Sequence, residues 1–415
     1  MDIDPVLSAL AAALSGEGPA VQLQPAAFPQ WLPIINLLPD ARSAFGDDDG
    51  IAVVVSTSGS TGRPKRTMLG VHALAASSMG TAVALGGEGQ WLLALPVHYV
   101  AGIQVLVRSL FAGTRPWVMD LSGGFSAEAF TAAAQEMTDR NRYTSLVPTQ
   151  LHRLLTDPAP ETLTVLRRFD AILLGGSPVT ADLLQSSRDA GIKVVTTYGM
   201  SETCGGCVYD GAPLEGVQVA VRDGRIWLGG DVVASGYLDA PGLTGQSFHT
   251  GRPGSGPGGE PGGGPGAEAP PAAGDAPALR WYRTDDEGEL TADGRLLVRG
   301  RVDDVIITGG IKVSAHLVAE RLRLLPGVRD VLVAGLPDHD WGQRVGAAVV
   351  GTCTVEELQA GAAAVLEPYA VPKTVLLIAE LPMLATGKPD RQELITRLAA
   401  GGTGHGSTAP RLPPQ

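Results

Sequence analysis

The strongest indication of the fold is the segment Ser56-Thr57-Ser58-Gly59-Ser60-Thr61-Gly62-Arg63-Pro64-Lys65. It directly follows Ile51–Val55, a short apolar run rich in β-branched residues, which predicts a strand. Glycine N–H groups and hydroxyls at the end of a strand can wrap a polyphosphate, and Lys65 adds a positive charge beside them. A flexible Ser/Gly linker is the simpler alternative, but a linker needs neither a preceding strand nor basic residues. We therefore predict a phosphate-binding loop.

The loop differs from the P-loop of nucleoside triphosphatases. Gly59 and Lys65 have the P-loop spacing, but Pro64 stands in place of the second glycine. Arg66 stands in place of the Ser or Thr whose hydroxyl would bind magnesium. The sequence therefore predicts a phosphate loop of another kind.

Further apolar runs follow, separated by helix-like stretches. Trp91–Leu95, Ala171–Leu174 and Val194–Thr197 are predicted strands, and this alternation is typical of α/β layers. Loops of small or polar residues follow the last two runs, and ligands of α/β sheets bind at the carboxyl ends of strands. From about Gln218 onward, short strands with tight turns predict a β-rich subdomain.

The predicted fold is α/β with two domains. A large N-terminal domain (1–302) has layered α/β sheets and the β-rich subdomain, and a small, mobile α+β C-terminal domain follows (303–400). The segment 250–278 holds ten Gly and seven Pro in 29 residues, too few apolar groups to offset the entropy of ordering. It is expected to be a disordered insertion, and 401–415 a disordered tail.

Composition excludes several classes of protein. The formal net charge of the 415 residues is −12, which disfavours a nucleic-acid partner. No apolar run is long enough to span a membrane, and no secretory signal is visible, so we expect a cytoplasmic protein. The three cysteines fit a reducing compartment. Cys204 and Cys207 form a C-x-x-C without further zinc ligands, which favours two small residues in a Gly-rich turn.

Five further motifs occur in a fixed order after the loop. They are Tyr198-Gly199-Met200-Ser201-Glu202-Thr203, Tyr282-Arg283-Thr284-Asp285-Asp286-Glu287-Gly288, Gly300-Arg301-Val302-Asp303-Asp304, Gly309-Gly310-Ile311-Lys312 and the segment Pro382–Arg391. Together with the phosphate loop, they resemble the acyl-adenylate-forming superfamily of acyl-CoA synthetases, peptide-synthetase adenylation domains and luciferases. The resemblance covers about residues 50 to 395.

The resemblance implies a site for ATP and Mg²⁺. Tyr198 would stack on adenine, Ser201 would lie near the α-phosphate, and Asp286 would bind the ribose hydroxyls. Glu202 and Thr61 would hold magnesium, which prefers hard oxygen ligands shared with phosphate. The full implied ATP site consists of Thr57, Ser58, Gly59, Ser60, Thr61, Gly62, Gly175, Gly176, Ser177, Tyr198, Gly199, Ser201, Asp286 and Arg301. Asp285 is a departure, because the family has Gly there.

The resemblance also implies catalysis in two steps with coenzyme A as co-substrate. Lys388 would stabilise the charge that develops when a carboxylate attacks the α-phosphate, assisted by Glu202 and Lys65. Asp303 would be the hinge about which the small domain turns. Gly309, Gly310 and Lys312 would then line the path of the thiol, although Lys312 is equally well explained as a surface lysine.

The acid is indicated by the segment Leu93–Arg108, which resembles that of o-succinylbenzoate–CoA ligases of menaquinone biosynthesis. Either His98 or Tyr99 would be the gate of the acyl pocket. Arg108 would orient a substrate carboxylate, directly or through a helper, or would form a structural salt bridge. Another aryl- or acyl-CoA ligase and a catalytically impaired ATP-binding relative remain alternatives. Homo-oligomerisation stays open.

Overall fold

The computed structural model describes residues 3–25, 33–43, 50–57, 65–121, 123–251, 278–383 and 389–401. Several predicted features lie outside these ranges: the loop residues Ser58, Gly59, Ser60, Thr61 and Gly62, most of the Gly/Pro-rich insertion, Lys388, and nearly all of the tail. The side chains of Thr57 and Asp303 lie outside the description as well. No helix within the described ranges is long and apolar enough to cross a membrane.

The chain divides into two compact units. The first contains residues 1–284 and 288–297, and the second contains residues 285–287 and 298–415. This division falls a few residues before the boundary at 302/303 that the sequence predicts, and it assigns Asp285–Glu287 to the second unit.

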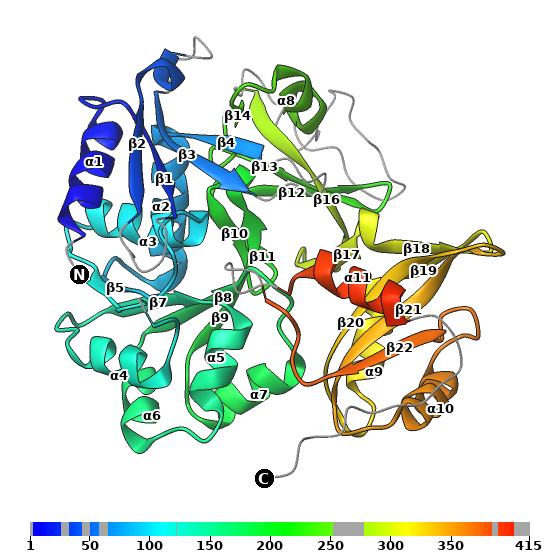
Figure 1. The fold of residues 1–415 in the computed structure, drawn as a ribbon. Helices are drawn as coiled ribbons and strands as arrows, with labels where there is room; N and C mark the ends of the chain where they lie inside the picture. The colour runs from blue at the N-terminus through cyan, green and yellow to red at the C-terminus, as the bar shows by residue number, and fades with distance from the viewer. Residues whose placement is uncertain are drawn as a thin grey trace. The chain divides into compact units, whose positions relative to one another are not determined.

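Sheet A of the first unit contains β3, the strand that precedes the predicted phosphate loop (Figure 1). Its strand order is β14-β4-β3-β1-β2. The bounds are β1 (Ala20–Gln24), β2 (Ile34–Leu38), β3 (Ile51–Thr57), β4 (Lys65–Gly70) and β14 (Gly236–Tyr237). α1 (Asp4–Ser15) and the 3₁₀ turn η1 (Pro39–Ser43) accompany this sheet. β3 and β4 are antiparallel, and Thr57 faces Lys65 across the ladder.

Sheet B is mostly parallel, with the order β11-β10-β9-β8-β7-β5-β6. Its strands are β5 (Gln90–Leu93), β6 (Trp117–Val118), β7 (Arg142–Leu146), β8 (Ala171–Gly175), β9 (Val194–Met200), β10 (Gly205–Tyr209) and β11 (Ala212–Pro213). The helices around it are α2 (Val71–Leu85), α3 (Val100–Phe111), α4 (Ala127–Gln135), α5 (Pro148–Leu155), α6 (Pro160–Arg167) and α7 (Ala181–Asp189). The 3₁₀ turn η2 (Ser201–Thr203) joins β9 to β10.

Both faces of sheet B are buried, because successive side chains of a strand point to opposite faces. On β5, Trp91 and Leu93 join the core that contains α2, α3 and sheet A, whereas Leu92 joins a second core with Phe130 and Leu151 of α4 and α5. The helices α4 to α7 therefore cover the face of sheet B that lies away from α2 and α3 (Figure 1).

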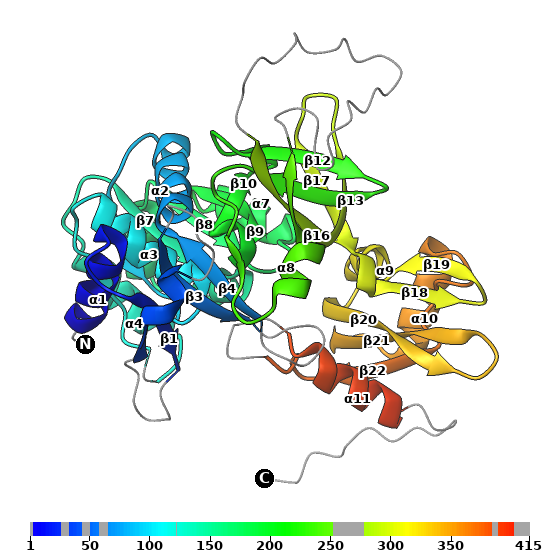
Figure 2. The ribbon, with the colours of Figure 1, turned by 90° about the horizontal axis from the view of Figure 1, so that it is seen from above.

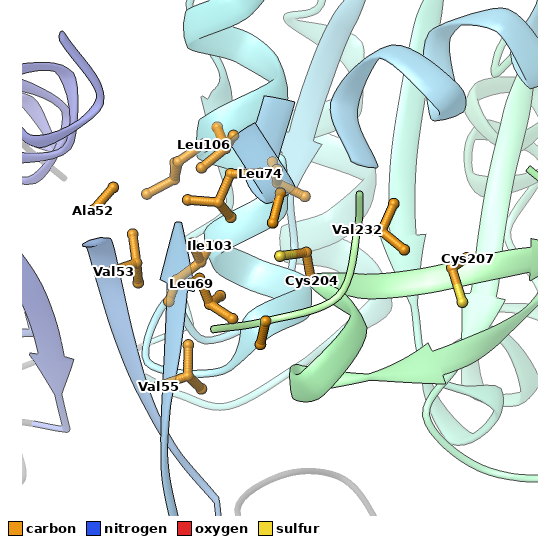
Figure 3. Packing of buried hydrophobic residues seen from close by; sticks show 14 of the residues in the cluster. Ala52, Val53, Val55, Leu69, Leu74, Ile103, Leu106, Cys204, Cys207 and Val232 are labelled. Carbon is orange, nitrogen blue, oxygen red and sulfur yellow. The ribbon is translucent and has the colours of Figure 1, made fainter. Parts of the chain in front are cut away.

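The two cysteines of the C-x-x-C motif belong to the first of these cores. Cys204 and Cys207 are both fully buried, and neither forms a disulfide. Figure 3 shows them on separate parts of the chain, Cys204 at a turn and Cys207 on a strand, with sulfurs pointing in different directions. Burial raises the pKa of the Cys207 thiol to about 12, so it stays protonated and unreactive. The predicted Gly-rich turn therefore holds for Cys204, which follows η2, whereas Cys207 lies on β10.

Sheet C is the predicted β-rich subdomain. It has the order β12-β13-β16-β15, with β17 paired to β16. The bounds are β12 (Gln218–Arg222), β13 (Arg225–Gly229), β15 (Phe248–Gly251), β16 (Leu279–Leu290) and β17 (Leu296–Arg301), with α8 (Pro241–Ser247) before β15. Asp223 and Gly224 have φ values of 50° and 77°, the two-residue turn that matches the twist of a hairpin.

The second unit is a small α+β domain (Figure 2). Sheet D has the order β19-β18-β21-β20, with β22 paired to β21. The bounds are β18 (Val305–Thr308), β19 (Ile311–Ser314), β20 (Val328–Asp338), β21 (Gly342–Gly351), β22 (Thr374–Ile378), η3 (Val302–Asp304), α9 (Ala315–Arg323), α10 (Val355–Val365) and α11 (Arg391–Gly401). α9 and α10 pack on one face of the sheet, with Val349, and α11 packs on the other, with Val350.

The stability of this second unit depends on the buried face of α9. Leu322→Ala leaves a cavity at a fully buried site and is expected to lower the free energy of unfolding by about 2–5 kcal/mol. Leu324→Ala, two residues on and 76% exposed, is the matched control and is expected to change it by less than about 0.5 kcal/mol. Urea denaturation followed by circular dichroism measures both. Equal losses would contradict the packing described.

Candidate active site

The carboxyl ends of β8 and β9 lie side by side. Gly175, the last residue of β8, is in register with Thr197 of β9. A Cβ on Gly175 would lie 2.3 Å from the Thr197 hydroxyl, so only glycine allows this approach. Gly176 has a φ of 81°, which favours glycine and turns the chain away from the sheet into Ser177. Two segments that the sequence assigns to the nucleotide site, 175–177 and 198–202, are therefore neighbours.

The turn after β9 carries the acidic residue of the site. Ser201 and Glu202 are only 6% and 7% exposed, and they form η2 between the antiparallel strands β9 and β10. The Thr203 hydroxyl accepts a hydrogen bond from the backbone N–H of Met200 and donates to the carbonyl of Gly205, 2.8 Å away. Gly199 lies against the opposing strand, and a Cβ there would meet the Gly205 carbonyl at 2.1 Å. The turn is thus held rigidly.

Tyr237, which the sequence analysis does not single out, contacts the acidic residue of this turn. The phenol of Tyr237, on β14, donates a hydrogen bond to Oε1 of Glu202 at 2.8 Å. The ammonium of Lys65, at the start of β4, lies 5.4 Å from the centre of the Tyr237 ring. Strand pairing explains the proximity, since Tyr237 faces Thr67 across the β14–β4 ladder and Lys65 is the next residue on that face.

The Glu202 carboxylate fits a magnesium ion shared with a substrate. Within the described ranges, Oε1 has a single partner, Tyr237, and Oε2 has none. No group of three or more His, Cys, Asp or Glu that could hold a metal occurs in the described part of the chain. Mg²⁺ usually takes one or two carboxylates and completes its octahedron with water and phosphate oxygens. A buried carboxylate with one described partner is therefore suited to Mg²⁺ bound together with a nucleotide.

The start of α3 is packed tightly against the segment before it. Tyr99 is the N-cap of α3, and a Cβ on Gly102 would lie 2.2 Å from the Pro96 carbonyl. The rings of His98 and Tyr99 are in contact, with centroids 4.1 Å apart. Burial lowers the pKa of His98, which favours its neutral form, and raises the pKa of Tyr99.

His98 also borders an apolar pocket. The pocket is lined by Ile3, Pro25, Pro33, Leu93, Leu95, Pro96, Val97, His98, Val118, Met119 and Leu121. Tyr99 does not line it. Of the two predicted gate residues, His98 thus faces a pocket at the carboxyl ends of β5 and β6, and Tyr99 sits at the helix N-terminus.

Arg108 lies deeper, in the interior. Nine residues of helix place it about 13 Å further along α3 than Tyr99. Its guanidinium lies 4.9 Å from the Trp91 ring and donates to the Tyr209 hydroxyl at 3.4 Å, while its Nε has no partner. Among the described residues no carboxylate pairs with it. The predicted structural salt bridge is thus not found among the described residues, and Arg108 contacts the Trp91 ring and the Tyr209 phenol in the core instead.

The second unit contains two predicted nucleotide residues, Asp286 and Arg301. Arg301 forms an ion pair with Asp285, the residue before Asp286. Asp285 Oδ2 is 3.9 Å from Nη2 of Arg301, and each side chain is 45% exposed. Asp286, the predicted ribose ligand, follows Asp285 on β16 and is half-buried. Arg391, the last residue of the motif that contains Lys388, forms a 3.1 Å ion pair with Asp304 of the hinge motif. These two motifs are therefore tied together within one unit.

The predicted coenzyme A residues form a tight hairpin. Gly309 and Gly310 connect β18 to β19 with φ values of 56° and 81°, the two-residue hairpin turn that favours Gly, Asn or Asp at these positions. Lys312 is exposed on β19. A Cβ on Gly309 would lie 2.5 Å from the ring of Trp341, whose side chain is 61% exposed. An exposed indole at the hairpin is a flat surface that the sequence motifs did not reveal.

Comparison with known proteins agrees with this architecture. The family model for AMP-binding enzyme matches residues 7–238, and that for the AMP-binding enzyme C-terminal domain matches residues 318–388. The chain belongs to the AMP-binding enzyme family. The resemblance to the acyl-adenylate-forming superfamily, and the α/β fold with a small C-terminal domain, are confirmed.

Individual relatives are more specific. The chain is 40% identical over 402 residues to a probable 2-succinylbenzoate–CoA ligase of Mycobacterium tuberculosis, covering 95% of both chains. It is 28% identical to a 2-succinylbenzoate–CoA ligase of Enterococcus faecalis, covering 84% of this chain and 70% of that protein. Among solved structures, o-succinylbenzoate CoA synthetase of Bacillus subtilis with its acyl-adenylate intermediate is 27% identical, with a TM-score of 0.66 over 84% of this chain and 69% of that one.

The buried carboxylate is open to a direct test. Glu202→Gln keeps the size of the side chain but removes the charge, and we expect pyrophosphate release to fall by at least about a hundredfold. The exposed Glu161→Gln, on α6, serves as the control. Initial rates over a range of Mg²⁺ concentrations measure the effect. An unchanged rate for Glu202→Gln would remove this residue from the site.

Proposed function

We propose that this chain is an ATP- and Mg²⁺-dependent acid–CoA ligase whose acid is o-succinylbenzoate. The observation that carries the proposal is the buried Glu202 carboxylate at the carboxyl end of β9, the strand beside β8 and its Gly175. Tyr237 binds this carboxylate, and Lys65 lies near the Tyr237 ring. The 40% identity to the mycobacterial relative over 95% of both chains supports the choice of acid.

In the first half-reaction, an oxygen of the acid attacks the α-phosphorus of ATP and pyrophosphate leaves. When bound, Mg²⁺ would neutralise phosphate charge, with Glu202 as its protein ligand. Lys65 adds a positive charge at the end of the phosphate loop. Lys388 would orient the carboxylate and the phosphate and stabilise the charge that both develop. The buried surroundings of Glu202 strengthen these interactions relative to water.

In the second half-reaction, the thiolate of coenzyme A attacks the acyl carbonyl and AMP leaves, so the mixed anhydride becomes a thioester. We assign this step to the hairpin at Gly309 and Gly310, with Asp303 as the hinge of the second unit. Both glycines have positive φ values, which glycine adopts at no steric cost. Cytoplasmic location and the absence of nucleic-acid partners remain predictions.

The choice of acid is tested with a panel of substrates. We expect kcat/KM for pyrophosphate release to be at least about 100-fold higher with o-succinylbenzoate than with benzoate, because the second substituent carries a polar group that a matching site recognises. Lys388→Ala measures the background and is expected to reduce release by about 100-fold. Turnover of benzoate without turnover of o-succinylbenzoate would overturn the choice of acid. ATP binding without release for any acid would favour the catalytically impaired alternative.

The hairpin is tested by separating the two half-reactions. Gly309→Ala places a methyl group against Trp341 in a strained backbone, and we expect thioester formation to slow by about tenfold or more while pyrophosphate release in single turnover stays within about twofold. Gly294→Ala has the same kind of strain, with a φ of 79°, but its Cβ meets open space, so it controls for strain alone. Equal slowing of both half-reactions by Gly309→Ala would refute the assignment.

A further inference from the structure

We propose that Tyr237 is a positioning residue for adenylate formation: its phenol fixes the Glu202 carboxylate so that the second oxygen is available to the metal, and its ring guides Lys65. This inference rests on the proposed function, because it deepens the role given there to Glu202 and Lys65. Tyr237 itself need not touch the substrate.

The hydrogen bond to Glu202 connects two sheets. Glu202 belongs to the turn at the end of sheet B, whereas Tyr237 is on β14 at the edge of sheet A. The backbone N–H of Ala234 donates to the carbonyl of Glu202 at 2.9 Å, and the N–H of Ser235 donates to the carbonyl of Met68 at 3.0 Å. The segment that carries Tyr237 is therefore attached to the acidic turn and to β4 at once.

The ring of Tyr237 has little freedom to move. Tyr237 is only 1% exposed, and its backbone N–H donates to the Thr244 hydroxyl at 2.9 Å. Its ring meets that of Phe248 edge-on, with centroids 5.3 Å apart and planes at 71°, and Phe248 in turn packs on Tyr282. Edge-to-face packing of this kind fixes ring orientation. Because the ring is fixed, the position of its hydroxyl is fixed as well.

The hydrogen bond orients the Glu202 carboxylate. Burial raises the pKa of the Tyr237 phenol, and the neighbouring Glu202 charge raises it further. A donor on Oε1 restricts rotation of the carboxylate, which leaves Oε2 facing away from the phenol.

The same ring contacts the cation of the site. An ammonium near the face of a tyrosine ring is attracted by the negative charge of that face. With Lys65 Nζ at 5.4 Å from the ring centre, Tyr237 contacts both the carboxylate and the lysine. A purely structural tyrosine would need only a partner for its hydroxyl, which any backbone carbonyl supplies. Contact with two charged residues of one site favours positioning.

Tyr237→Phe tests the inference, because it removes the hydroxyl and keeps the ring. We expect the dissociation constant of Mn²⁺, measured by electron paramagnetic resonance in the presence of a non-hydrolysable ATP analogue, to rise by about 10–100-fold. We also expect the Mg²⁺ concentration for half-maximal pyrophosphate release to rise. Tyr143→Phe is the matched control: this buried tyrosine donates to the Gly87 carbonyl at 3.0 Å, far along the chain from the acidic turn.

The outcomes separate positioning from mere stability. If both variants lower the melting temperature but only Tyr237→Phe weakens metal binding, the inference holds. If Tyr237→Phe binds Mn²⁺ like the unaltered protein, the inference is overturned. In a double-mutant cycle, Tyr237→Phe should add little to Glu202→Gln, and full additivity would also overturn it. If Mn²⁺ binding responds as expected but no acid is adenylated, the positioning role stands and the proposed function fails.

Discussion

The buried carboxylate of Glu202 limits what the candidate site can bind. An ionised group that is 7% exposed is costly unless it is hydrogen-bonded or paired. At Glu202 the described partner is one phenol, so the stabilisation is incomplete without a cation. This is the state expected of a site that acquires a metal together with its nucleotide, since a fully satisfied carboxylate would have no oxygen left to share.

The loops at the strand ends were predictable from sequence because each is local. Motif 198–203 follows a β-branched run, and the hairpins at 223–224 and 309–310 are set by adjacent residues with φ above zero. The small α+β domain was predictable for the same reason. In each case the residues that determine the element are also those that form it.

Tyr237 and Arg108 were harder to interpret, because their partners are distant in sequence. Tyr237 contacts Glu202, 35 positions away, because β14 pairs with β4. A strand of two residues is too short to be predicted from the sequence pattern. Arg108 suggested a substrate carboxylate because a cation in an apolar run needs compensation. The structure supplies an aromatic face and a phenol instead, and part of the guanidinium stays without a partner. Periodicity predicts that such a residue is buried but not what surrounds it.

Asp285 stands where the family has Gly, which the sequence alone suggests as a sign of lost catalysis. The structure weakens that argument. Glycine would be required at this position by a φ above zero, and Asp285 is not among the described residues that adopt one. Its carboxylate competes with a nucleotide for Arg301, but the pair is 3.9 Å apart and both side chains are 45% exposed. Exposed ion pairs of this kind contribute at most about 1 kcal/mol, which corresponds to about a fivefold loss of affinity. A loss of this size would not by itself prevent nucleotide binding, so Asp285 alone is weak support for the catalytically impaired alternative.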